Sequence, residues 1–416
     1  MIYRISKSPK NLVGEITLPA SKSESNRALI IQALCKQKFN ISNLSDAEDT
    51  AVVNNILNQK IAAQHIDVGP SGTAMRFLTA YFALQEGTRT ITGSERMKER
   101  PIKLLVQALQ QLGAKIEYLE KDGFPPLKIS GQKLQGGRIQ IDGSMSSQYL
   151  SALALIAPTL PEGLKIQLKG EVISKPYLLM TLKMMEYFGV KSEWKTNEIC
   201  IAAQAYQAPA SGSFAVEGDW SAASYWYQMA AFAKEVDLKI YGLKPKSLQG
   251  DAALIDYFLP LGVETKFIEG GIQLKNRNIT TPVDNLHLEM MNTPDIAQTL
   301  AVTYAGKEIY AELYGLRTLR IKETDRIKAL IHELKKIGVS AIDLDIGNLL
   351  IPKIKRAIHP PTATFQTYKD HRMAMCLAPL SMLFNHVDIE DPEVVGKSYP
   401  EFWRDLQRMG FEIERL

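Results

Sequence analysis

The stretch Leu109–Gly113 (LQQLG) recurs along the chain as Met185–Gly189 (MEYFG), Leu334–Gly338 (LKKIG) and Leu406–Gly410 (LQRMG), with a looser copy at Tyr257–Gly262. The five closing glycines follow one another at steps of 76, 73, 76 and 72 residues. Glycine adopts positive φ without steric cost and is the usual residue just past the end of a helix. Each copy is therefore predicted to end a helix, and the regular long period predicts a chain built from one repeated unit.

A second landmark recurs with the same period: a short polar stretch that opens directly into an apolar helix. The openings are Ser21–Asn26, Ser71–Thr73, Ser146–Gln148, Ser221–Ser224, Thr293–Asp295 and Asp370–Arg372. The steps between them are 50, 75, 75, 73 and 76 residues, counted from Lys22 through Gly72, Ser147, Ala222 and Asp295 to His371. The sequence thus predicts six units, and the first of them is shortened within Asn58–Val68.

Each unit is predicted to alternate strands and helices, which makes the fold class α/β. Alternating apolar residues, as in Leu164–Leu168, are typical of half-buried strands, and apolar residues at three- and four-residue steps, as in Ile102–Leu112, are typical of amphipathic helices. A chain of 416 residues is too long for a single core and favours two domains. Six units divide evenly into three and three, whereas the periods of an elongated solenoid are shorter and more uniform.

The composition excludes several classes of protein. Hydrophobic residues at 45% and charged residues at 23% are typical of a globular protein, and no stretch approaches the roughly 18–20 uninterrupted apolar residues of a membrane span. The stretch MIYRISKSPKN lacks the apolar core of a signal peptide, and the distant Cys35, Cys200 and Cys376 indicate thiols in a reducing compartment. We therefore expect a cytoplasmic protein with no membrane partner. A net charge of +4 is too small to indicate nucleic-acid binding, but it permits a local site for a small anion.

The helix openings combine anion-binding geometry with cations. Backbone N–H groups and the macrodipole make a helix N-terminus a natural anion site. Lys22, Arg27 and Arg372 are predicted to lie in the first turns of their helices, where the dipole disfavours positive charge. A bound phosphate or carboxylate would compensate for these cations, and so would a structural salt bridge. Ser221 and Ser224 have the simpler explanation of helix caps.

Nine longer motifs follow one another almost from end to end of the chain. They are Leu18–Leu29 (LPASKSESNRAL), Gly72–Arg76 (GTAMR), Arg96–Ile102 (RMKERPI), Ser146–Leu153 (SSQYLSAL), Ser174–Tyr177 (SKPY), Val216–Tyr225 (VEGDWSAASY), Lys322–Ile327 (KETDRI), Lys369–Met375 (KDHRMAM) and Gly396–Phe402 (GKSYPEF). In this order they resemble the motifs of the EPSP synthase family, the 3-phosphoshikimate 1-carboxyvinyltransferases. Nine motifs in the right order leave little room for a chance match.

The resemblance implies an architecture. EPSP synthases have two similar domains, each made of three βαβαββ units, with helix N-termini that point into the cleft between them. One domain would then be Met1–Ala20 plus about Asp219–Leu416, and the other would be about Ser21–Gly218. The active site would lie in the interdomain cleft and be assembled from both domains when substrate closes the cleft. A monomer is expected.

The resemblance also implies a reaction. The enolpyruvyl group of phosphoenolpyruvate is transferred to the 5-hydroxyl of shikimate 3-phosphate, through a tetrahedral intermediate that loses phosphate, in the shikimate pathway to chorismate and the aromatic amino acids. Both substrates are polyanions, so the site needs several fixed cations. Two stages of proton transfer need a carboxylate base, a second acid/base group and an ammonium near the phosphate. No metal or organic cofactor is implied, and the expected partners are the two small-molecule substrates.

The motifs place each implied role on this chain. The residues that match the family's catalytic groups are Lys22, Asp295 and Glu323. The residues that match its shikimate 3-phosphate site are Lys22, Ser23, Arg27, Ser146, Ser147, Gln148, Ser174, Tyr177, Asp295 and Lys322. The residues that match its phosphoenolpyruvate site are Lys22, Gly72, Arg100, Gln148, Arg326, Arg372 and Lys397. His371 is a candidate for shuttling or orienting a proton, and a structural imidazole is the alternative.

The chain departs from the family pattern near Gly72. The family commonly has Asn two residues before this glycine, where the side chain helps to bind phosphoenolpyruvate. This chain has Pro70, which lacks that side chain and a backbone N–H. Phe77 stands where Pro or Leu is usual. We expect these changes to weaken the binding of phosphoenolpyruvate and of the inhibitor glyphosate without changing the reaction.

Two alternatives are disfavoured by particular residues. UDP-N-acetylglucosamine enolpyruvyl transferase shares the fold and the donor, but it has Asn at the position of Ser23 and usually a cysteine in the loop that here is Ser94–Pro101 (SERMKERP). A DNA sliding clamp is a ring of repeated α/β units, but it needs a strong basic field. With 49 basic and 45 acidic residues, the chain lacks one.

Overall fold

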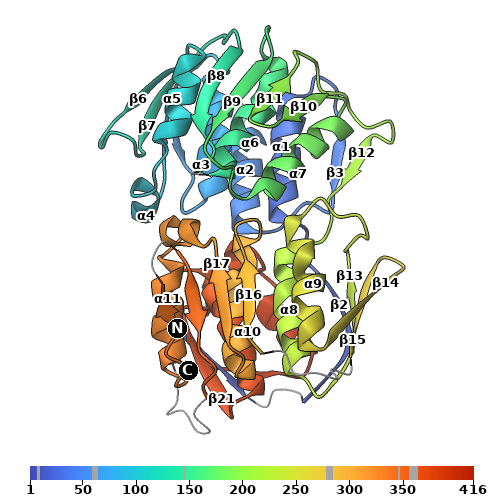
Figure 1. Ribbon diagram of the computed structural model, residues 1–416. Helices are drawn as coiled ribbons and strands as arrows, with labels where there is room; N and C mark the ends of the chain where they lie inside the picture. The colour runs from blue at the N-terminus through green and yellow to red at the C-terminus, as the bar shows by residue number, and fades with distance from the viewer. Residues whose placement is uncertain (7–9, 59–63, 145, 278–283, 345–346, 356–363) are drawn as a thin grey trace. The chain divides into compact units, whose positions relative to one another are not determined.

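The structure is a computed structural model that describes residues 1–6, 10–58, 64–144, 146–277, 284–344, 347–355 and 364–416 (Figure 1). The chain divides into two compact units, and each buries its own hydrophobic core. Unit 1 is Met1–Ala20 with Glu217–Leu416, and unit 2 is Ser21–Val216. The two termini lie in the same sheet of unit 1, because β1 (Ile2–Ser6) pairs with β22 (Glu412–Arg415).

Unit 1 is built on three four-stranded sheets with one common strand order. In each sheet the first two strands are parallel and the other pairs are antiparallel. In sheet order they are β2 (Asn11–Thr17), β13 (Glu235–Tyr241), β15 (Gly271–Asn276) and β14 (Val263–Ile268); β16 (Leu286–Glu289), β17 (Ala311–Tyr314), β19 (Leu349–Ile351) and β18 (Ile342–Asp343); and β20 (Thr364–Phe365), β21 (His386–Glu390), β1 and β22. The N-terminal β1 and β2 thus complete the sheets of two different repeats.

Unit 2 has two sheets of the same order and one short sheet. The four-stranded sheets are β4 (His65–Asp67), β5 (Gly87–Thr92), β7 (Leu127–Gly131) and β6 (Lys115–Tyr118), and β8 (Gly137–Asp142), β9 (Leu164–Lys169), β11 (Glu198–Ile201) and β10 (Ser192–Lys195). The short sheet is the parallel pair β12 (Ser213–Ala215) and β3 (Asn40–Ser42). It belongs to the first repeat, which the sequence predicts to be shortened. Residues 59–63 of the predicted shortening lie outside the described residues.

Each repeat supplies one central helix and one outer helix. The central helices are α1 (Lys22–Leu34), α3 (Gly72–Ala83) and α6 (Ser147–Ile156) in unit 2, and α8 (Trp220–Phe232), α10 (Ala297–Lys307) and α12 (His371–Leu377) in unit 1. The outer helices are α2 (Glu48–Asn58), α5 (Lys103–Gln111), α7 (Lys175–Tyr187), α9 (Leu254–Phe258), α11 (Arg326–Lys335) and α13 (Phe402–Arg408); the short α4 (Glu95–Lys98) precedes α5. The α/β class and the βαβαββ repeat are thereby confirmed.

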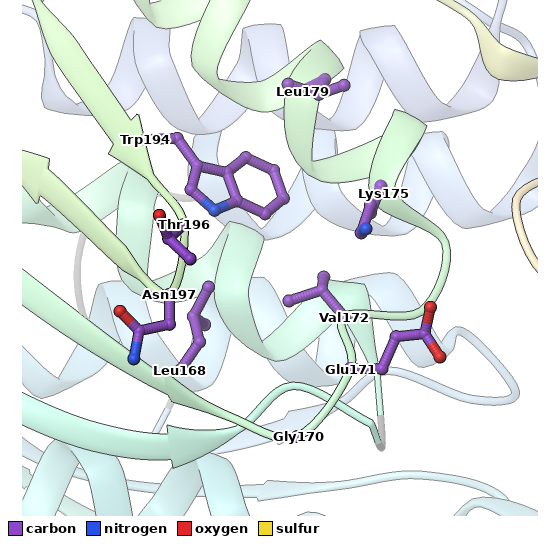
Figure 2. A pocket seen from close by; sticks show the side chains of 9 residues that line it. All are labelled: Leu168, Gly170, Glu171, Val172, Lys175, Leu179, Trp194, Thr196 and Asn197. Atoms are coloured by element: carbon purple, nitrogen blue, oxygen red, sulfur yellow. The ribbon is translucent and has the colours of Figure 1, made fainter.

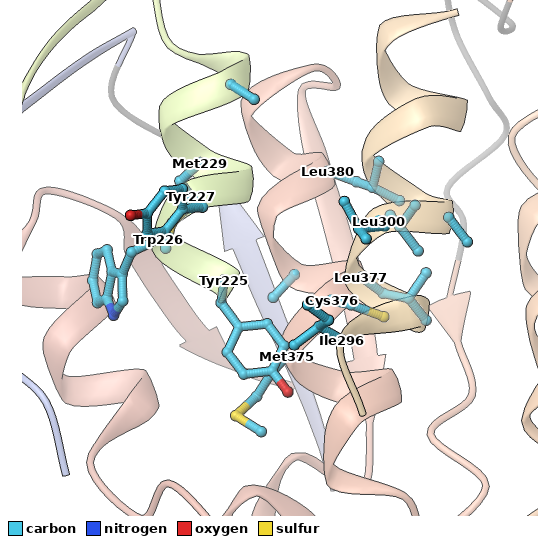
Figure 3. Close-up of a cluster of buried hydrophobic side chains, with 14 of the residues drawn as sticks. Tyr225, Trp226, Tyr227, Met229, Ile296, Leu300, Met375, Cys376, Leu377 and Leu380 are labelled. Carbon is cyan, nitrogen blue, oxygen red and sulfur yellow. The ribbon is translucent and has the colours of Figure 1, made fainter. Parts of the chain in front are cut away.

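The core of unit 1 holds its three central helices together (Figure 3). Tyr225 of α8, Leu300 of α10 and Leu377 of α12 are all buried in it. Two hydrogen bonds add fixed registers, because Ser224 Oγ lies 3.1 Å from Thr299 Oγ1, and Gln228 Nε2 donates to the Cys376 carbonyl at 2.9 Å. Helices that are apolar on most sides must be buried on most sides, so these three helices form the middle of the unit.

The repeated glycines end helices, as predicted. Gly113, Gly189, Gly262, Gly338 and Gly410 all have positive φ, between 81° and 96°. In the four close copies the residue after the glycine donates its N–H to the carbonyl of the first residue of the stretch, at distances of 2.9–3.1 Å. These bonds satisfy carbonyls that the helix end leaves open. The chain then turns into β6, β10, β14, β18 or β22.

No described helix combines the length and the apolar run that crossing a bilayer requires.

Candidate active site

Side chains cap five of the six predicted helix openings. Ser21, Ser71, Ser146, Asp219 and Asp370 each accept a hydrogen bond from a backbone N–H in the first turn of their helix. α10 instead begins with the 3₁₀ turn η4 (Pro294–Ile296). Ser221 and Ser224 are not the caps, since Asp219 caps α8. The capping residues orient the first turns, and those turns contain the predicted site residues Lys22, Ser23, Gly72, Ser147, Gln148, His371 and Arg372.

Arg27 of unit 2 is a buried cation that binds neutral oxygens. It lies in the second turn of α1, not the first as predicted. Its guanidinium donates to Thr181 Oγ1 at 2.7 Å, Ser151 Oγ at 3.3 Å, and the carbonyls of Ser23 and Tyr177 at 2.8 and 3.1 Å. Burial lowers the pKa of Arg27 to about 10. The Arg27 guanidinium therefore links α1, α6 and α7 by hydrogen bonds. Its positive charge would also attract an anion that approaches it.

Most other predicted residues of unit 2 lie at the starts of its helices, and Arg100 lies between α4 and α5. Lys22 is the first residue of α1, and its Nζ lies 3.1 Å from Asp49 Oδ2. A carboxylate thus compensates this cation in the chain alone. Ser146 and Ser147 begin α6, and Ser174, in the left-handed conformation with φ 53°, precedes α7. Tyr177 lies in the first turn of α7, and its carbonyl accepts from Arg27.

Gly72 marks the place where two guanidiniums converge. A Cβ atom at this position would lie 2.6 Å from Arg76 Nη1 and 2.8 Å from Arg100 Nη1, so any larger residue would displace them. Gln148 reaches the same place, because its Nε2 donates to Thr73 Oγ1 at 3.2 Å. Arg76 is not among the residues predicted from the sequence. Its position one turn after Gly72, in the motif GTAMR, is the signal that could have indicated it.

The two departures from the family pattern, Pro70 and Phe77, lie before and after Gly72 in the chain. Pro70 is exposed and lies in a tight turn in which Ser71 donates its N–H to the Val68 carbonyl at 3.1 Å. Gly69 takes the left-handed conformation there, with φ 54°. Phe77 is buried, and its ring centroid lies 5.5 Å from the Arg27 guanidinium carbon. Phe77 therefore supports Arg27 by a cation–π contact.

Three cations of unit 1 contact Asp295. Its Oδ1 lies 3.2 Å from Arg326 Nη1 and 3.7 Å from Lys322 Nζ, and its Oδ2 lies 3.2 Å from Arg372 Nη2. Asp295 lies in η4, Arg372 in the first turn of α12, and Arg326 is the first residue of α11. A structural salt bridge thus compensates Arg372 against the helix dipole in the chain alone.

Arg326 joins three carboxylates. Besides Asp295 it binds Glu323 Oε2 at 3.0 Å through Nη2 and Asp370 Oδ2 at 2.7 Å through Nε. Its side chain is only 2% exposed. Burial opposes the charge on Arg326, but Asp370, Glu323 and Asp295 together outweigh it, so the pKa of Arg326 is raised. Arg326 is therefore a permanent cation with a fixed position.

Lys397 extends the network to a row of alternating charges. Lys397 is the last residue of η7 (Pro392–Lys397), and its Nζ lies 2.7 Å from Glu323 Oε1. The row of predicted residues is therefore Arg372, Asp295, Arg326, Glu323 and Lys397. His371 is buried at the start of α12, and its Nδ1 lies 3.7 Å from Asp370 Oδ1.

Asp251 is a second residue that the sequence analysis missed. It lies in η2 (Gly250–Ala253), is buried, and accepts a hydrogen bond from the Ser221 hydroxyl. Burial, and then the negative charge of Asp295, raise the pKa of Asp251 to about 7. A single aspartate after a glycine carries no pattern in the sequence. Only the fold brings Asp251 within the field of Asp295.

A hollow of about 390 Å³ lies elsewhere on unit 2, between the β10–β11 hairpin and the start of α7 (Figure 2). Trp194 and Lys175 line it, together with Leu168, Gly170, Glu171, Val172, Leu179, Thr196 and Asn197. It contains no predicted site residue. Among the described residues no group of three or more His, Cys, Asp or Glu is arranged to hold a metal ion.

Comparison with known proteins identifies the family. The model of EPSP synthase (3-phosphoshikimate 1-carboxyvinyltransferase) matches residues 6–62 and 52–406. The chain belongs to the EPSP synthase family. The 3-phosphoshikimate 1-carboxyvinyltransferase of Bacteroides fragilis strain YCH46 is 45% identical over 415 residues, which cover 100% of this chain and 99% of the relative. The protein of the same name from Mannheimia haemolytica is 36% identical, with 95% and 96% covered.

Solved structures agree with the EPSP synthase fold. EPSP synthase from Acinetobacter baumannii superposes with a TM-score of 0.78 at 21% identity, and 100% of each chain is covered. The enolpyruvyl transferase NikO from Streptomyces tendae superposes with a TM-score of 0.71 at 16% identity, with 99% and 98% covered. The family match favours neither of the alternatives, the UDP-N-acetylglucosamine transferase and the sliding clamp.

Proposed function

We propose that this chain transfers the enolpyruvyl group of phosphoenolpyruvate to the 5-hydroxyl of shikimate 3-phosphate and releases phosphate. The observation that carries the proposal is the row of alternating charges in a member of the EPSP synthase family: Asp295 and Glu323 stand among Arg326, Arg372 and Lys397. The reaction needs two carboxylates for proton transfer and several cations for anionic substrates. The row supplies both within one unit.

Asp295 is the proposed base. It takes the proton of the 5-hydroxyl as the oxygen attacks C2 of phosphoenolpyruvate. In the chain alone its carboxylate is bound by Arg326 and Arg372, which stabilises its charged form. The phosphate and carboxylate of a bound substrate compete for the same guanidiniums. Substrate binding thus draws positive charge away from Asp295 and makes it a stronger base at the moment when it is needed.

Glu323 is the proposed second acid/base group, and Lys22 is the proposed ammonium near the phosphate. C3 of the enolpyruvyl group gains a proton in the addition step and loses one when phosphate leaves. Arg326 binds one carboxylate oxygen of Glu323 and Lys397 binds the other, so the two ion pairs fix the position of this side chain. The ammonium of Lys22 is proposed to stabilise the phosphate. His371 is proposed to orient Asp370 and the start of α12, since its imidazole is buried beside that carboxylate.

The substrate sites are proposed from the same contacts. Shikimate 3-phosphate binds unit 2 through Lys22, Arg27 and the helix starts at Ser146, Ser147 and Ser174, with Ser23, Gln148 and Tyr177 beside them. Lys322 and Asp295 of unit 1 complete its proposed site. Phosphoenolpyruvate binds Arg326, Arg372 and Lys397 of unit 1 and Lys22, Gly72, Arg100 and Gln148 of unit 2. Arg76 is added to this set because it lies with Arg100 at Gly72. Both units would then contribute to one active site.

The proposal also covers where the protein acts, its oligomeric state and its need for a cofactor. The protein is proposed to act as a cytoplasmic monomer without a cofactor, because the proposed acids, bases and cations are all side chains of one chain. It would serve the synthesis of chorismate and aromatic amino acids.

A phosphate-release assay tests the function. Purified protein is mixed with phosphoenolpyruvate and either shikimate 3-phosphate or UDP-N-acetylglucosamine as acceptor. Release with the first acceptor and none with the second is expected. Release with UDP-N-acetylglucosamine alone would assign the sister reaction, and release with neither would overturn the proposal.

A further inference from the structure

Glu333 is a buried carboxylate of unit 1 that the reaction does not use. It lies on the outer helix α11, and its side chain is 0% exposed. Oε1 accepts a hydrogen bond from the Tyr368 hydroxyl at 2.7 Å, and Oε2 accepts from the Gln366 backbone N–H at 3.1 Å and from Lys336 Nζ at 2.7 Å. A buried carboxylate is costly unless such donors surround it. Glu333 therefore binds the segment Gln366–Tyr368 firmly.

The bound segment leads into a left-handed turn. Tyr368 and Lys369 have φ of 54° and 56°, so two successive residues with side chains adopt a conformation that favours glycine. Neither residue would hold this conformation without outside support, because it is strained for residues with a Cβ. Asp370 follows at once and caps α12 by accepting the Arg372 N–H at 2.9 Å.

The same helix holds the far end of the turn. Arg326, in the first turn of α11, donates to Asp370 Oδ2 at 2.7 Å. Arg326 and Glu333 are seven residues apart, so they lie on one face of the helix, roughly 10 Å apart along its axis. One face of α11 thus holds the turn at both ends, through Gln366 before it and through Asp370 after it. This face therefore determines where α12 begins.

We propose that Glu333 and Tyr368 are positioning residues for Arg372. They hold the left-handed turn, the turn places Asp370, and Asp370 sets the first turn of α12, from which Arg372 reaches Asp295 at 3.2 Å. The inference rests on the proposed function, in which Arg372 binds phosphoenolpyruvate. When the tether from Glu333 is cut, the turn relaxes to negative φ and Arg372 loses its position.

The expected signature falls mainly on one substrate. Most proposed anchors of shikimate 3-phosphate, such as Arg27 and Ser147, belong to unit 2, and Asp295 of unit 1 should keep its contacts with Arg326 and Lys322 when Arg372 moves. Tyr368→Phe keeps the ring and deletes the hydroxyl that Glu333 accepts, and Glu333→Gln keeps the shape and removes the charge. Each variant should raise the KM for phosphoenolpyruvate roughly tenfold, as for a lost hydrogen bond to a charged group. The KM for shikimate 3-phosphate should stay within about twofold of the wild-type value, a difference that corresponds to less than about 0.5 kcal/mol in binding free energy.

Steady-state kinetics of both substrates tests the inference, with Tyr227→Phe as the matched control. Tyr227 is a buried tyrosine of unit 1, whose hydroxyl lies 2.8 Å from Thr265 Oγ1, away from the turn, whereas Tyr368 is half-buried. The control should leave both KM values unchanged. Adding Lys369→Gly to Tyr368→Phe should partly lower the KM for phosphoenolpyruvate again, because glycine adopts positive φ without steric cost.

The outcomes separate the two proposals. A wild-type protein that releases no phosphate from the two substrates overturns the proposed function. If the wild type is active, any of three results overturns the inference. The first is an unchanged KM for phosphoenolpyruvate in Tyr368→Phe, the second is an equal rise of both KM values in that variant, and the third is a failure of Lys369→Gly to rescue it. If Glu333→Gln fails to fold, Tyr368→Phe and its rescue still decide the matter.

Discussion

The guanidinium of Arg326 lies 3.2 Å from the carboxylate of Asp295, although 31 residues separate them in the chain. The pair joins the start of α11 to the start of α10, and two more carboxylates complete the partners of Arg326. Because its guanidinium is buried and binds three carboxylates, Arg326 is a structural centre of unit 1, and it is also a proposed ligand of phosphoenolpyruvate.

Asp295→Asn should separate binding from turnover. The amide keeps the shape of the side chain but cannot take a proton, so turnover should fall by at least about 10²-fold, the lower end for general acid–base catalysis. Phosphoenolpyruvate should bind as tightly or more tightly, because Arg326 and Arg372 lose a competing anion. Titration calorimetry and single-turnover phosphate release measure both effects. Asp256→Asn, at an exposed position of α9, is the control, and a variant that keeps more than a tenth of the activity would move the base elsewhere.

Arg326→Met should destabilise unit 1 strongly. The change leaves Asp295, Glu323 and Asp370 close together with their central cation removed, and breaking a buried ion pair costs about 3–5 kcal/mol. Urea unfolding at pH 7 measures the loss. Arg320→Met, which breaks a partly exposed pair with Asp343, should cost less than about 1 kcal/mol. Equal losses in the two variants would contradict the central role of Arg326.

Asp251→Asn should change how stability depends on pH. The folded protein keeps the Asp251 proton up to a pKa of about 7, whereas the unfolded chain releases it near the ordinary value of 3.8. Wild-type stability should therefore fall as pH rises from about 4 to about 7, by roughly 1.4 kcal/mol per pH unit from this group. The variant lacks this slope, so its stability relative to wild type should rise by about 3 kcal/mol between pH 5 and pH 8. Chemical unfolding at the two pH values measures the difference, and parallel curves would show that Asp251 titrates normally.

Pro70→Asn should tighten phosphoenolpyruvate binding. Asparagine restores an amide side chain and a backbone donor two residues before Gly72, and a hydrogen bond to a charged group is worth roughly 1.5–3 kcal/mol, or about ten- to a hundredfold in affinity. The KM for phosphoenolpyruvate and the inhibition constant of glyphosate should both fall, and the KM for shikimate 3-phosphate should not change. Pro161→Asn, at another exposed turn of unit 2, is the control. Unchanged or weaker donor binding would mean that the turn at Pro70 is rebuilt around proline.

The repeat and the class of fold follow from local sequence patterns alone. The glycines at Gly113, Gly189, Gly338 and Gly410 end helices because the hydrogen bond that closes each end is local, between residues five apart. The polar helix openings were equally visible, since a cap binds an N–H within its own first turn. The nine motifs, ordered along the chain, pointed to the family that the comparisons then showed.

The pairing of the site residues depends instead on how distant segments pack together. No local pattern states that Arg326 binds Asp370, that Arg27 is surrounded by neutral oxygens, or that Arg76 meets Arg100 at Gly72. Asp251 and Glu333 have no motif at all, because their properties come from burial and from partners that other repeats or distant segments supply. Local hydrogen bonds can be read along a chain, whereas charges interact through space, and the distances between them exist only after the repeats have packed.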